Sequence, residues 1–488
     1  MSGTPKTPVI EALKRYTDEK IIRFHMPGHK GTGTAGNKMA EYLGQMVFKV
    51  DVTNIPGLDD LHQPEGVIRE AQELAALTFG SDRTYFLVNG SSCGLQALVM
   101  TLCGPGEKIL VPRNIHRSIL SGIILSGSFP VYYRPEYNSR YNIPMGILPE
   151  TIERSLKEHP DIKGVLLVNP TYHGITSDIP AISAIVHEHG IPLVVDEAHG
   201  PHLYFSDALP QSSLEGGADA VVQGTHKILP AFTQASMLHL KGTRINRERL
   251  AAALRMLQST STSYLLIGSL DAARAQMETL GRELTGQAVE LSLYIRSNIE
   301  KTEGIASFAG EIAGSHGVCG LDLTKVTISL RELGVSGPWA EKWLRENCGI
   351  QVEMSDVYNL LLIVGFGNSR SDADRLMVAL GQMIQYVRKK MVKNIDEKTS
   401  LIPFPDVPEL VATPREAFYA PVTTVQLAHA ANRTCAEIIA SYPPGIPVIC
   451  PGEKISPEII EHLVFLRSLG MHFQGCNDAS LETIQVLS

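Results

Sequence analysis

Short apolar runs alternate with longer amphipathic segments through the middle of the chain. The runs at 84–88, 108–111, 164–168, 193–195 and 220–222 predict buried strands. Segments of helical length lie among them, at 66–79, after a turn at 90–94, at 149–158 and at 180–189. Strands that are separated by helices predict a mainly parallel sheet covered on both faces, which is an α/β fold.

The pattern changes on both sides of this region. Residues 1–60 predict an N-terminal arm of one helix and Gly/Pro-rich loops, followed by a large domain over 61–300. The segment 268–300 has few helix breakers and predicts a long helix that leads out of that domain. Strands at 320–323 and 360–364, with helices at 337–346 and 371–389, predict a small α+β domain over 301–400. The charged run 388–390 and the Pro-rich 401–414 predict a linker, and 401–488 a C-terminal α+β subdomain.

Composition narrows the class of protein. The 488 residues are 44% hydrophobic and carry a net charge of −8, which is typical of a folded protein of two or three domains and disfavours a nucleic-acid partner. Seven scattered cysteines without CxxC pairs predict reduced thiols. No apolar run reaches the length of a membrane span and no signal peptide is apparent, so we expect a cytoplasmic protein.

Lys227 and Asp196 follow successive predicted strands, and the carboxyl edge of an open α/β sheet is where ligands bind. A desolvated lysine there loses its proton and attacks carbonyl groups. A buried carboxylate there keeps a pyridine nitrogen protonated, as pyridoxal phosphate (PLP) requires. The two residues are 31 positions apart, about one βαβ step, so we expect them to face one pocket. Considered alone, Lys227 could equally be an ordinary surface lysine.

The segment 88–94 (VNGSSCG) leads from a strand into a helix. Hydroxyls and free N–H groups at a helix N-terminus bind phosphate, which makes Ser91, Ser92 and Cys93 candidates, although plain capping by serine is an alternative. The same letters match G-x-S-x-G, the nucleophile elbow of α/β-hydrolases. In that interpretation Ser92 is a nucleophile with an Asp and a His downstream, but Lys227 and the hydroxyl-rich 259–263 have no role.

His116 follows the strand at 108–111, from where its ring can stack on an aromatic cofactor, although a lone histidine is more often structural. The histidines at 187/189 and 199/202 lack a surrounding set of metal ligands, so we expect no metal site.

These segments together resemble the Orn/Lys/Arg decarboxylase family, PLP enzymes of the aspartate-aminotransferase-like type I fold. The run at 225–236 (THKILPAFTQAS) is similar to the family's S-x-H-K…Q-A-S attachment signature. Further matches lie at 24–30 (FHMPGHK), 51–62 (DVTNIPGLDDLH), 89–93, 112–118, 196–199 and 442–447 (YPPGIP), so the resemblance spans nearly the whole chain. The length is similar to that of the shorter, biosynthetic members.

The resemblance implies a role for each matching residue. Lys227 holds PLP as a Schiff base, Asp196 pairs with the pyridine nitrogen, and His116 stacks on the ring. His226 lies beside the cofactor and delivers a proton to Cα. The remaining implied contacts are the phosphate loop Ser91, Ser92 and Cys93, the ring neighbours Ala198 and His199, the cofactor contact Thr225, the cross-dimer phosphate contacts Ser261 and Thr262, and the substrate pocket Arg415, Glu416, Pro444 and Gly445.

Two positions depart from the family pattern. Gly224 stands where the family has a serine, which removes one phosphate hydroxyl. His199 stands where some members carry a tryptophan, so we expect different packing on the ring. Neither change removes a group that the chemistry requires.

The resemblance implies PLP-dependent α-decarboxylation of a basic amino acid by a homodimer or larger homo-oligomer with its active site at the interface. Arginine, converted to agmatine for polyamine biosynthesis, is the first expectation, and lysine and ornithine are the alternatives. Other interpretations are an aminotransferase or carbon–sulfur lyase on the same fold, a hydrolase that uses Ser92, and a decarboxylase-like binding subunit. We expect an acid such as Glu416 to meet the distal cation of the substrate.

Overall fold

The computed structural model describes residues 5–34, 36–392, 405–442 and 445–488. At its centre lies a seven-stranded sheet of order β1-β10-β9-β8-β6-β2-β3. Its strands are β1 (Arg83–Leu87), β2 (Lys108–Pro112), β3 (Phe129–Tyr133), β6 (Ile162–Val168), β8 (Leu193–Asp196), β9 (Ala220–Gln223) and β10 (Ser236–Leu240). Strands β9 to β3 pair in parallel, and β10 runs antiparallel to both of its neighbours, β1 and β9. The predicted mainly parallel sheet is therefore confirmed.

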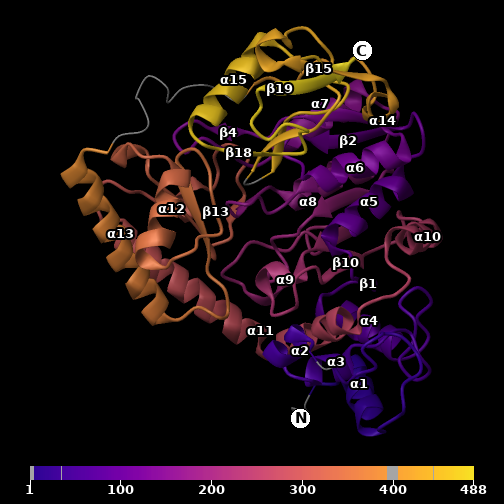
Figure 1. The fold of residues 1–488 in the computed structure, drawn as a ribbon. Helices are drawn as coiled ribbons and strands as arrows, with labels where there is room; N and C mark the ends of the chain where they lie inside the picture. The colour runs from indigo at the N-terminus through magenta and orange to yellow at the C-terminus, as the bar shows by residue number, and fades with distance from the viewer. Residues whose placement is uncertain (1–4, 35, 393–404, 443–444) are drawn as a thin grey trace.

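Helices cover both faces of this sheet. Along β8, Val194 packs on one face, whereas Leu193 and Val195 pack on the other, as the two-residue period of a strand requires. The first face meets α5 (Gly90–Leu102), α6 (Arg117–Ser126) and α10 (Arg247–Leu257). The second face meets α7 (Pro149–Glu158), α8 (Ile179–Glu188), α4 (Val67–Thr78) and α11 (Tyr264–Ile299). Both layers of helices are visible in Figure 1.

The N-terminal segment packs against α4 and α11. It contains α1 (Pro8–Asp18), α2 (Lys38–Leu43) and α3 (Met46–Val50), and Val9 and Leu13 of α1 are buried in this contact. Other large apolar side chains of the segment point outward, since Ile22, Phe24 and Tyr42 are 82%, 92% and 88% exposed.

A second sheet, β12-β14-β13, forms the orange part of Figure 1. The long helix α11 leads to it, and its apolar face packs on the last turns of α11 and on two further helices. These elements are α12 (Gly337–Cys348), α13 (Arg370–Lys390), β12 (Lys325–Ser329), β13 (Met354–Ser355) and β14 (Asn359–Ile363). We call this part, residues 305–390, the small region.

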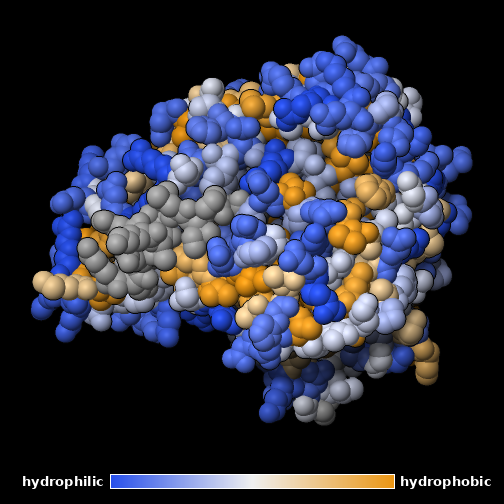
Figure 2. All heavy atoms as spheres, turned by 90° about the horizontal axis from the view of Figure 1, so that it is seen from above, coloured by the Kyte–Doolittle hydropathy of each residue, from blue (hydrophilic) through white to orange (hydrophobic). Residues whose placement is uncertain are grey.

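Residues 405–488 form a third unit with a core of its own, drawn yellow at the top of Figure 1. Its elements are α14 (Pro414–Tyr419), β15 (Val422–Gln426), β16 (Ile439–Tyr442), β17 (Ile446–Ile449), α15 (Pro457–Ser468), β18 (His472–Gln474) and β19 (Thr483–Leu487). Figure 2 views the molecule from this side and shows a mainly hydrophilic surface with separate hydrophobic patches.

Several local predictions were wrong. The turn expected at 90–94 is the first turn of α5, and the long helix begins at Tyr264, one turn before residue 268. The charged run 388–390, expected in a linker, instead forms the last turn of α13. Cations are stabilised there because the C-terminal end of a helix is partially negative. The strand expected at 320–323 has only two residues, β11 (Gly320–Leu321), which pair with β7 (Ile175–Thr176). Part of the predicted linker, 401–404, lies outside the described residues, and the domain boundaries stay predictions.

No helix within the described residues has both the length and the apolar character that a bilayer span requires.

Candidate active site

Five loops meet at the carboxyl edge of the central sheet, after β1, β2, β6, β8 and β9. Since these strands run in the same direction, their C-terminal ends share that edge, where open α/β sheets bind ligands. A cavity there is lined by Ser91, Leu95, Asn114, His116, Val168, Pro170, Tyr172, Asp196, Ala198, His199 and Lys227. The fold therefore brings together six residues predicted from the sequence, namely Ser91, His116, Asp196, Ala198, His199 and Lys227.

Lys227 lies in α9 (Thr225–Ile228), a single helical turn directly after β9. Its Nζ is 2.9 Å from Nε2 of His199 and 5.7 Å from the centre of the Tyr172 ring. Burial lowers the pKa of this amine, and the negative charges of Asp196 and Glu353 oppose that effect. A lowered pKa increases the neutral fraction of the amine, which is the form that attacks a carbonyl carbon.

Asp196 ends β8 and is only 5% exposed. Its Oδ1 accepts the Ala198 N–H at 3.2 Å, and the described residues offer it no ion-pair partner. Burial raises its pKa, and the Lys227 ammonium opposes that shift. An ionised carboxylate that is buried without a partner raises the free energy of the folded protein. A protonated pyridine nitrogen is a cation that would pair with it.

His116 is the N-cap of α6, and its Nδ1 accepts the Ser118 N–H at 3.2 Å. The proton of the neutral ring is therefore on Nε2. Burial and the Lys227 charge lower the pKa of His116 to about 4, so the ring is neutral near pH 7. A flat, neutral ring in the cavity fits the predicted stacking on an aromatic cofactor.

His199 packs on Tyr172, with ring centres 4.5 Å apart at 56°. Burial and the nearby Lys227 lower its pKa well below the usual range, so the ring is neutral and its Nε2 shares a hydrogen bond with the Lys227 amine. Its buried Nδ1 has no partner among the described residues. At this position, where some family members have tryptophan, the chain thus has a polar contact with the attachment lysine.

The start of α5 fits a phosphate group. Its N-cap, Asn89, makes no capping hydrogen bond through its side chain, so the first N–H groups of the helix stay available to an anion. Gly90 has a φ of +75°, which glycine adopts without strain. The Cys93 thiol instead donates to the Gly90 carbonyl and is buried, which raises its pKa to about 12. Cys93 therefore offers phosphate only its backbone N–H.

Two predicted cofactor contacts, Thr225 and Thr262, have buried hydroxyls without a partner in the described residues. Thr225 follows Gly224, where an added Cβ comes within 2.9 Å of the Ala198 carbonyl oxygen. The family's serine therefore needs a backbone shift at this position, and the Thr225 hydroxyl is an adjacent substitute. Asp196, Lys227 and the free end of α5 fit PLP, whereas Thr225 is not among the described lining residues of the cavity. Ser261 is exposed, and neither it nor Thr262 lines the described cavity.

His226, unlike Lys227, is not among the described lining residues of the cavity. Its Nδ1 is 2.9 Å from the Ala235 carbonyl, so Nδ1 carries a proton and donates it, and Nε2 is the free nitrogen. Burial lowers its pKa. The role of His226 in protonation stays a prediction.

Arg415, Glu416 and Gly445, which were predicted to shape the substrate pocket, are not among the described lining residues of the cavity. Arg415 donates to the Leu125 carbonyl of α6. The Glu416 carboxylate accepts the N–H and the hydroxyl of Thr413 at 2.8 Å each, hydrogen bonds that lower its pKa. Gly445 lies between β16 and β17, and Pro444 lies outside the described residues.

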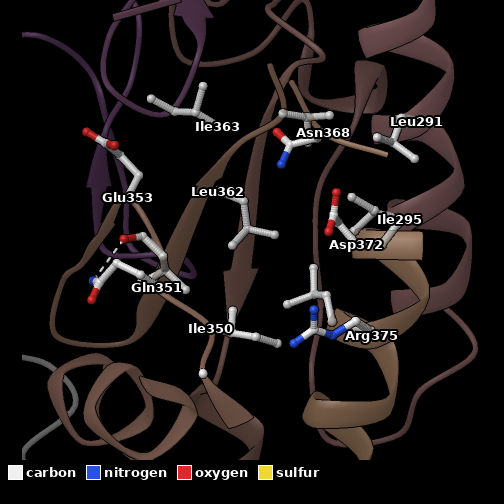
Figure 3. Close-up of a pocket in the computed structure, with 15 residues that line it drawn as sticks. Leu291, Ile295, Ile350, Gln351, Glu353, Leu362, Ile363, Asn368, Asp372 and Arg375 are labelled. Atoms are coloured by element: carbon white, nitrogen blue, oxygen red, sulfur yellow. Dashed lines mark hydrogen bonds between the residues drawn. The ribbon is translucent and has the colours of Figure 1, made fainter. Parts of the chain in front are cut away.

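Asn114, Tyr172 and Glu353 were missed by the sequence analysis. Asn114 lies within the family-like stretch 112–118, which was a usable signal, and its buried Oδ1 has no described partner. Tyr172 and Glu353 had no local signal. Glu353, just before β13, lies at one end of a second cavity of about 450 Å³ between β14, α11 and α13. Figure 3 shows Asp372 and Arg375 at the other side of this second cavity.

The hydrolase interpretation lacks its base. Ser92 lies in the first turn of α5, and no histidine among the described residues hydrogen-bonds to its hydroxyl. A serine nucleophile of that class needs such a partner.

The chain is similar to known PLP-family decarboxylases along nearly its whole length. The family models "Orn/Lys/Arg decarboxylase, major domain" and "Orn/Lys/Arg decarboxylase, C-terminal domain" match residues 7–372 and 399–480. Arginine decarboxylase of Bacillus subtilis (strain 168) is 41% identical over 482 residues, which cover 99% of this chain and 98% of that protein. The crystal structure of the Francisella novicida lysine decarboxylase LdcF matches with a TM-score of 0.85 and 25% identity, over 99% of this chain and 81% of that one.

A weaker match shows the fold alone. Aspartate aminotransferase from Thermus thermophilus has a TM-score of 0.50 and 16% identity, over 67% of this chain and 94% of that one. The predicted type I fold and its PLP cofactor are thereby confirmed. Since the major-domain model alone covers more than half of the residues, the chain belongs to the Orn/Lys/Arg decarboxylase family and is a PLP-dependent decarboxylase.

Proposed function

We propose that this chain decarboxylates L-arginine to agmatine and CO2, as a cytoplasmic step that feeds polyamine biosynthesis. The observation that carries the choice of arginine is the 41% identity, along nearly the full length of both chains, to a protein named arginine decarboxylase. The matched lysine decarboxylase structure is more distant, at 25% identity.

The residues of the cavity supply the groups that this reaction needs. When bound, PLP withdraws the electrons that the departing carboxyl group leaves at Cα. Asp196 stabilises the positive charge that this withdrawal depends on. The amine of Lys227, next to the neutral His199, is the first candidate to move a proton to Cα, and His226 is the second.

Glu353 supports a cationic substrate. Its charge acts on the Lys227 amine from the small region, and its side chain lines the second cavity. Arginine, lysine and ornithine all carry a distal cation, which a carboxylate favours over neutral side chains. Glu416, the acid expected from the sequence, caps α14 in this chain. We therefore propose Glu353 as the first acid to test for recognition of the distal cation.

We also propose that the enzyme is a homodimer or a larger homo-oligomer. Ile22, Phe24 and Tyr42 are large apolar residues and almost fully exposed, as expected of a surface that meets another copy. Sedimentation of the purified enzyme tests this, and a monomer at micromolar concentration would contradict it.

A substrate panel tests the reaction. We expect the PLP-loaded enzyme to release CO2 from arginine with a kcat/KM at least about tenfold above those for lysine and ornithine. A preference for lysine or ornithine would correct the substrate, and keto-acid formation without CO2 would contradict the decarboxylase. K227A should release no CO2, and borohydride should fix no cofactor on it. The matched control K342M changes an exposed lysine of α12 and should behave as the wild type.

The variant E353Q tests the distal contact. We expect its kcat/KM for arginine to fall about tenfold, which corresponds to about 1.4 kcal/mol, because the cation loses an opposite charge. E346Q removes an exposed carboxylate from the same region and should leave kcat/KM unchanged. Equal values for E353Q and the wild type would move the recognition to another acid.

A further inference from the structure

A fully buried lysine joins the small region to a wall of the active site. Lys325, the first residue of β12, has 0% exposure. Its Nζ donates to the His199 carbonyl at 3.2 Å and to Oδ2 of Asp322 at 2.8 Å. Because Nε2 of His199 lies 2.9 Å from Nζ of Lys227, a single residue separates Lys325 from the reacting amine.

Asp322 extends this contact to a second residue of the same loop. His202 Nε2 lies 3.1 Å from its Oδ1, and Thr324 donates to that oxygen from its N–H at 3.0 Å and its hydroxyl at 2.7 Å. Although burial alone raises the pKa of Asp322, His202 and Lys325 hold it well below its usual range. The carboxylate therefore stays ionised, and Lys325 keeps a charged partner.

The same segment also holds the loop after β6. The Asp322 N–H donates to the Gly174 carbonyl at 2.7 Å, and the Thr327 hydroxyl lies 3.0 Å from Nδ1 of His173. The two backbones touch, since a Cβ added to Gly174 comes within 2.8 Å of the Asp322 carbonyl oxygen. Tyr172, next to His173, lines the cavity.

We propose that Asp322, Thr324, Lys325 and Thr327 form a polar clamp that positions His199 and Tyr172 against Lys227. None of the four is among the described lining residues of the cavity, so they are positioning residues. A shift of β12 displaces both walls together, which couples the placement of the small region to the geometry of the pocket. The clamp concerns cofactor binding and holds whichever basic amino acid is the substrate.

The charge of Lys325 makes the clamp specific. The charged and titratable groups around it are Asp322, His199, His202, Lys227 and, from α11, Arg296, whose guanidinium donates to the Lys325 carbonyl. Replacing a buried ion pair by apolar groups is often neutral or stabilising, so stability alone does not explain the pair. Orientation of the two walls does.

The variant K325M tests the clamp in the PLP-loaded enzyme. We expect a weaker visible circular dichroism signal of the bound cofactor, because the walls that orient it are released. We expect kcat to fall by about tenfold to a hundredfold, as for other displacements of catalytic groups, with a smaller change in KM. K342M is the matched control, since Lys342 is an exposed lysine of the small region. A wild-type dichroism signal in folded K325M would overturn the proposal.

D322N and T327V keep the proposal testable if K325M does not fold. Both nearly preserve side-chain volume, and they remove the charged partner of Lys325 and the hydroxyl partner of His173, respectively. We expect both to weaken the cofactor dichroism while the far-ultraviolet spectrum stays that of the wild type. Two unchanged cofactor signals would overturn the clamp. Wild-type enzyme that shows the cofactor dichroism but releases no CO2 from arginine would instead contradict the proposed function alone.

Discussion

Asp196 and Glu197 are neighbours in the chain but have different surroundings in the fold. Asp196 faces the cavity, whereas Glu197 points into the protein with 0% exposure. Glu197 accepts the Ser213 N–H at 2.7 Å and the side-chain amide of Gln223 at 2.8 Å. Burial raises the pKa of Glu197 to about 7 in spite of these hydrogen bonds. One carboxylate thus serves the site, and the other links strands beneath it.

This shift predicts a pH-dependent stability. Between its ordinary value of 4.5 and about 7, folded Glu197 binds more proton than the unfolded chain, so the free energy of unfolding falls as pH rises through that window. The full effect is about 3 kcal/mol. We expect E197Q to lose this dependence in urea unfolding measured from pH 5 to 7.5, and to be less stable overall because an amide N–H meets the Ser213 N–H.

The control for this prediction is E346Q, which alters an exposed carboxylate and should keep the wild-type pH profile. An E197Q profile equal to that of the wild type would assign the dependence to another group.

The helices α5 and α13 differ at their N-termini. In α13, Ser369 and Asp372 form a capping box, and basic residues close the last turn. In α5, no side chain caps the N-terminus, which opens at the cavity. A helix whose first N–H groups are left free has an anion site, whereas a capped helix has satisfied these groups internally. Other helices, such as α4, α7 and α12, also lack a side-chain cap, so α5 is distinguished by the cavity at its N-terminus.

Removal of the Ser369 cap should weaken α13. We expect S369A to lower the free energy of unfolding by about 1 kcal/mol, because the Asp372 N–H loses its acceptor. Urea unfolding measures this change. S297A is the matched control, since the Ser297 hydroxyl bonds only a carbonyl of its own helix. Equal losses in both variants would contradict a capping role.

One buried ion pair joins the C-terminal unit to the central sheet. Arg113, directly after β2, is 4% exposed and pairs with the fully buried Glu453 through two hydrogen bonds. It also donates to the Val448 carbonyl at 3.1 Å. Arg113 precedes the cavity residue Asn114, so the C-terminal unit helps to hold the loop that carries His116.

Removal of Arg113 alone should lower the free energy of unfolding much more than removal of both Arg113 and Glu453. We expect R113M to lose about 3–5 kcal/mol of unfolding free energy, because Glu453 is left buried and unpaired, and R113M/E453M to recover part of that loss. A double-mutant cycle in urea measures the coupling. Additive losses would show that the two charges do not act as a pair.

The local pattern of the sequence was sufficient for five of the seven strands of the central sheet and for the core of the site. Periodicity identified the strands β6, β8 and β9, and parallel strands of necessity bring their C-terminal residues, such as Asp196 and Lys227, to one edge. Strands β3 and β10 were not predicted. The first residue of β10, Ser236, is the last residue of the attachment signature, and no strand was expected after it.

Contacts between distant segments could not be read from local pattern. The side of α5 that meets the cavity depends on its packing against the sheet, and this buries the Cys93 thiol while Ser91 lines the site. Glu353 and Lys325 act on Lys227 from the small region because the long helix α11 turns the chain back toward the site. Such placement depends on the packing of whole elements, whereas the propensities and motifs of a sequence act over a few residues.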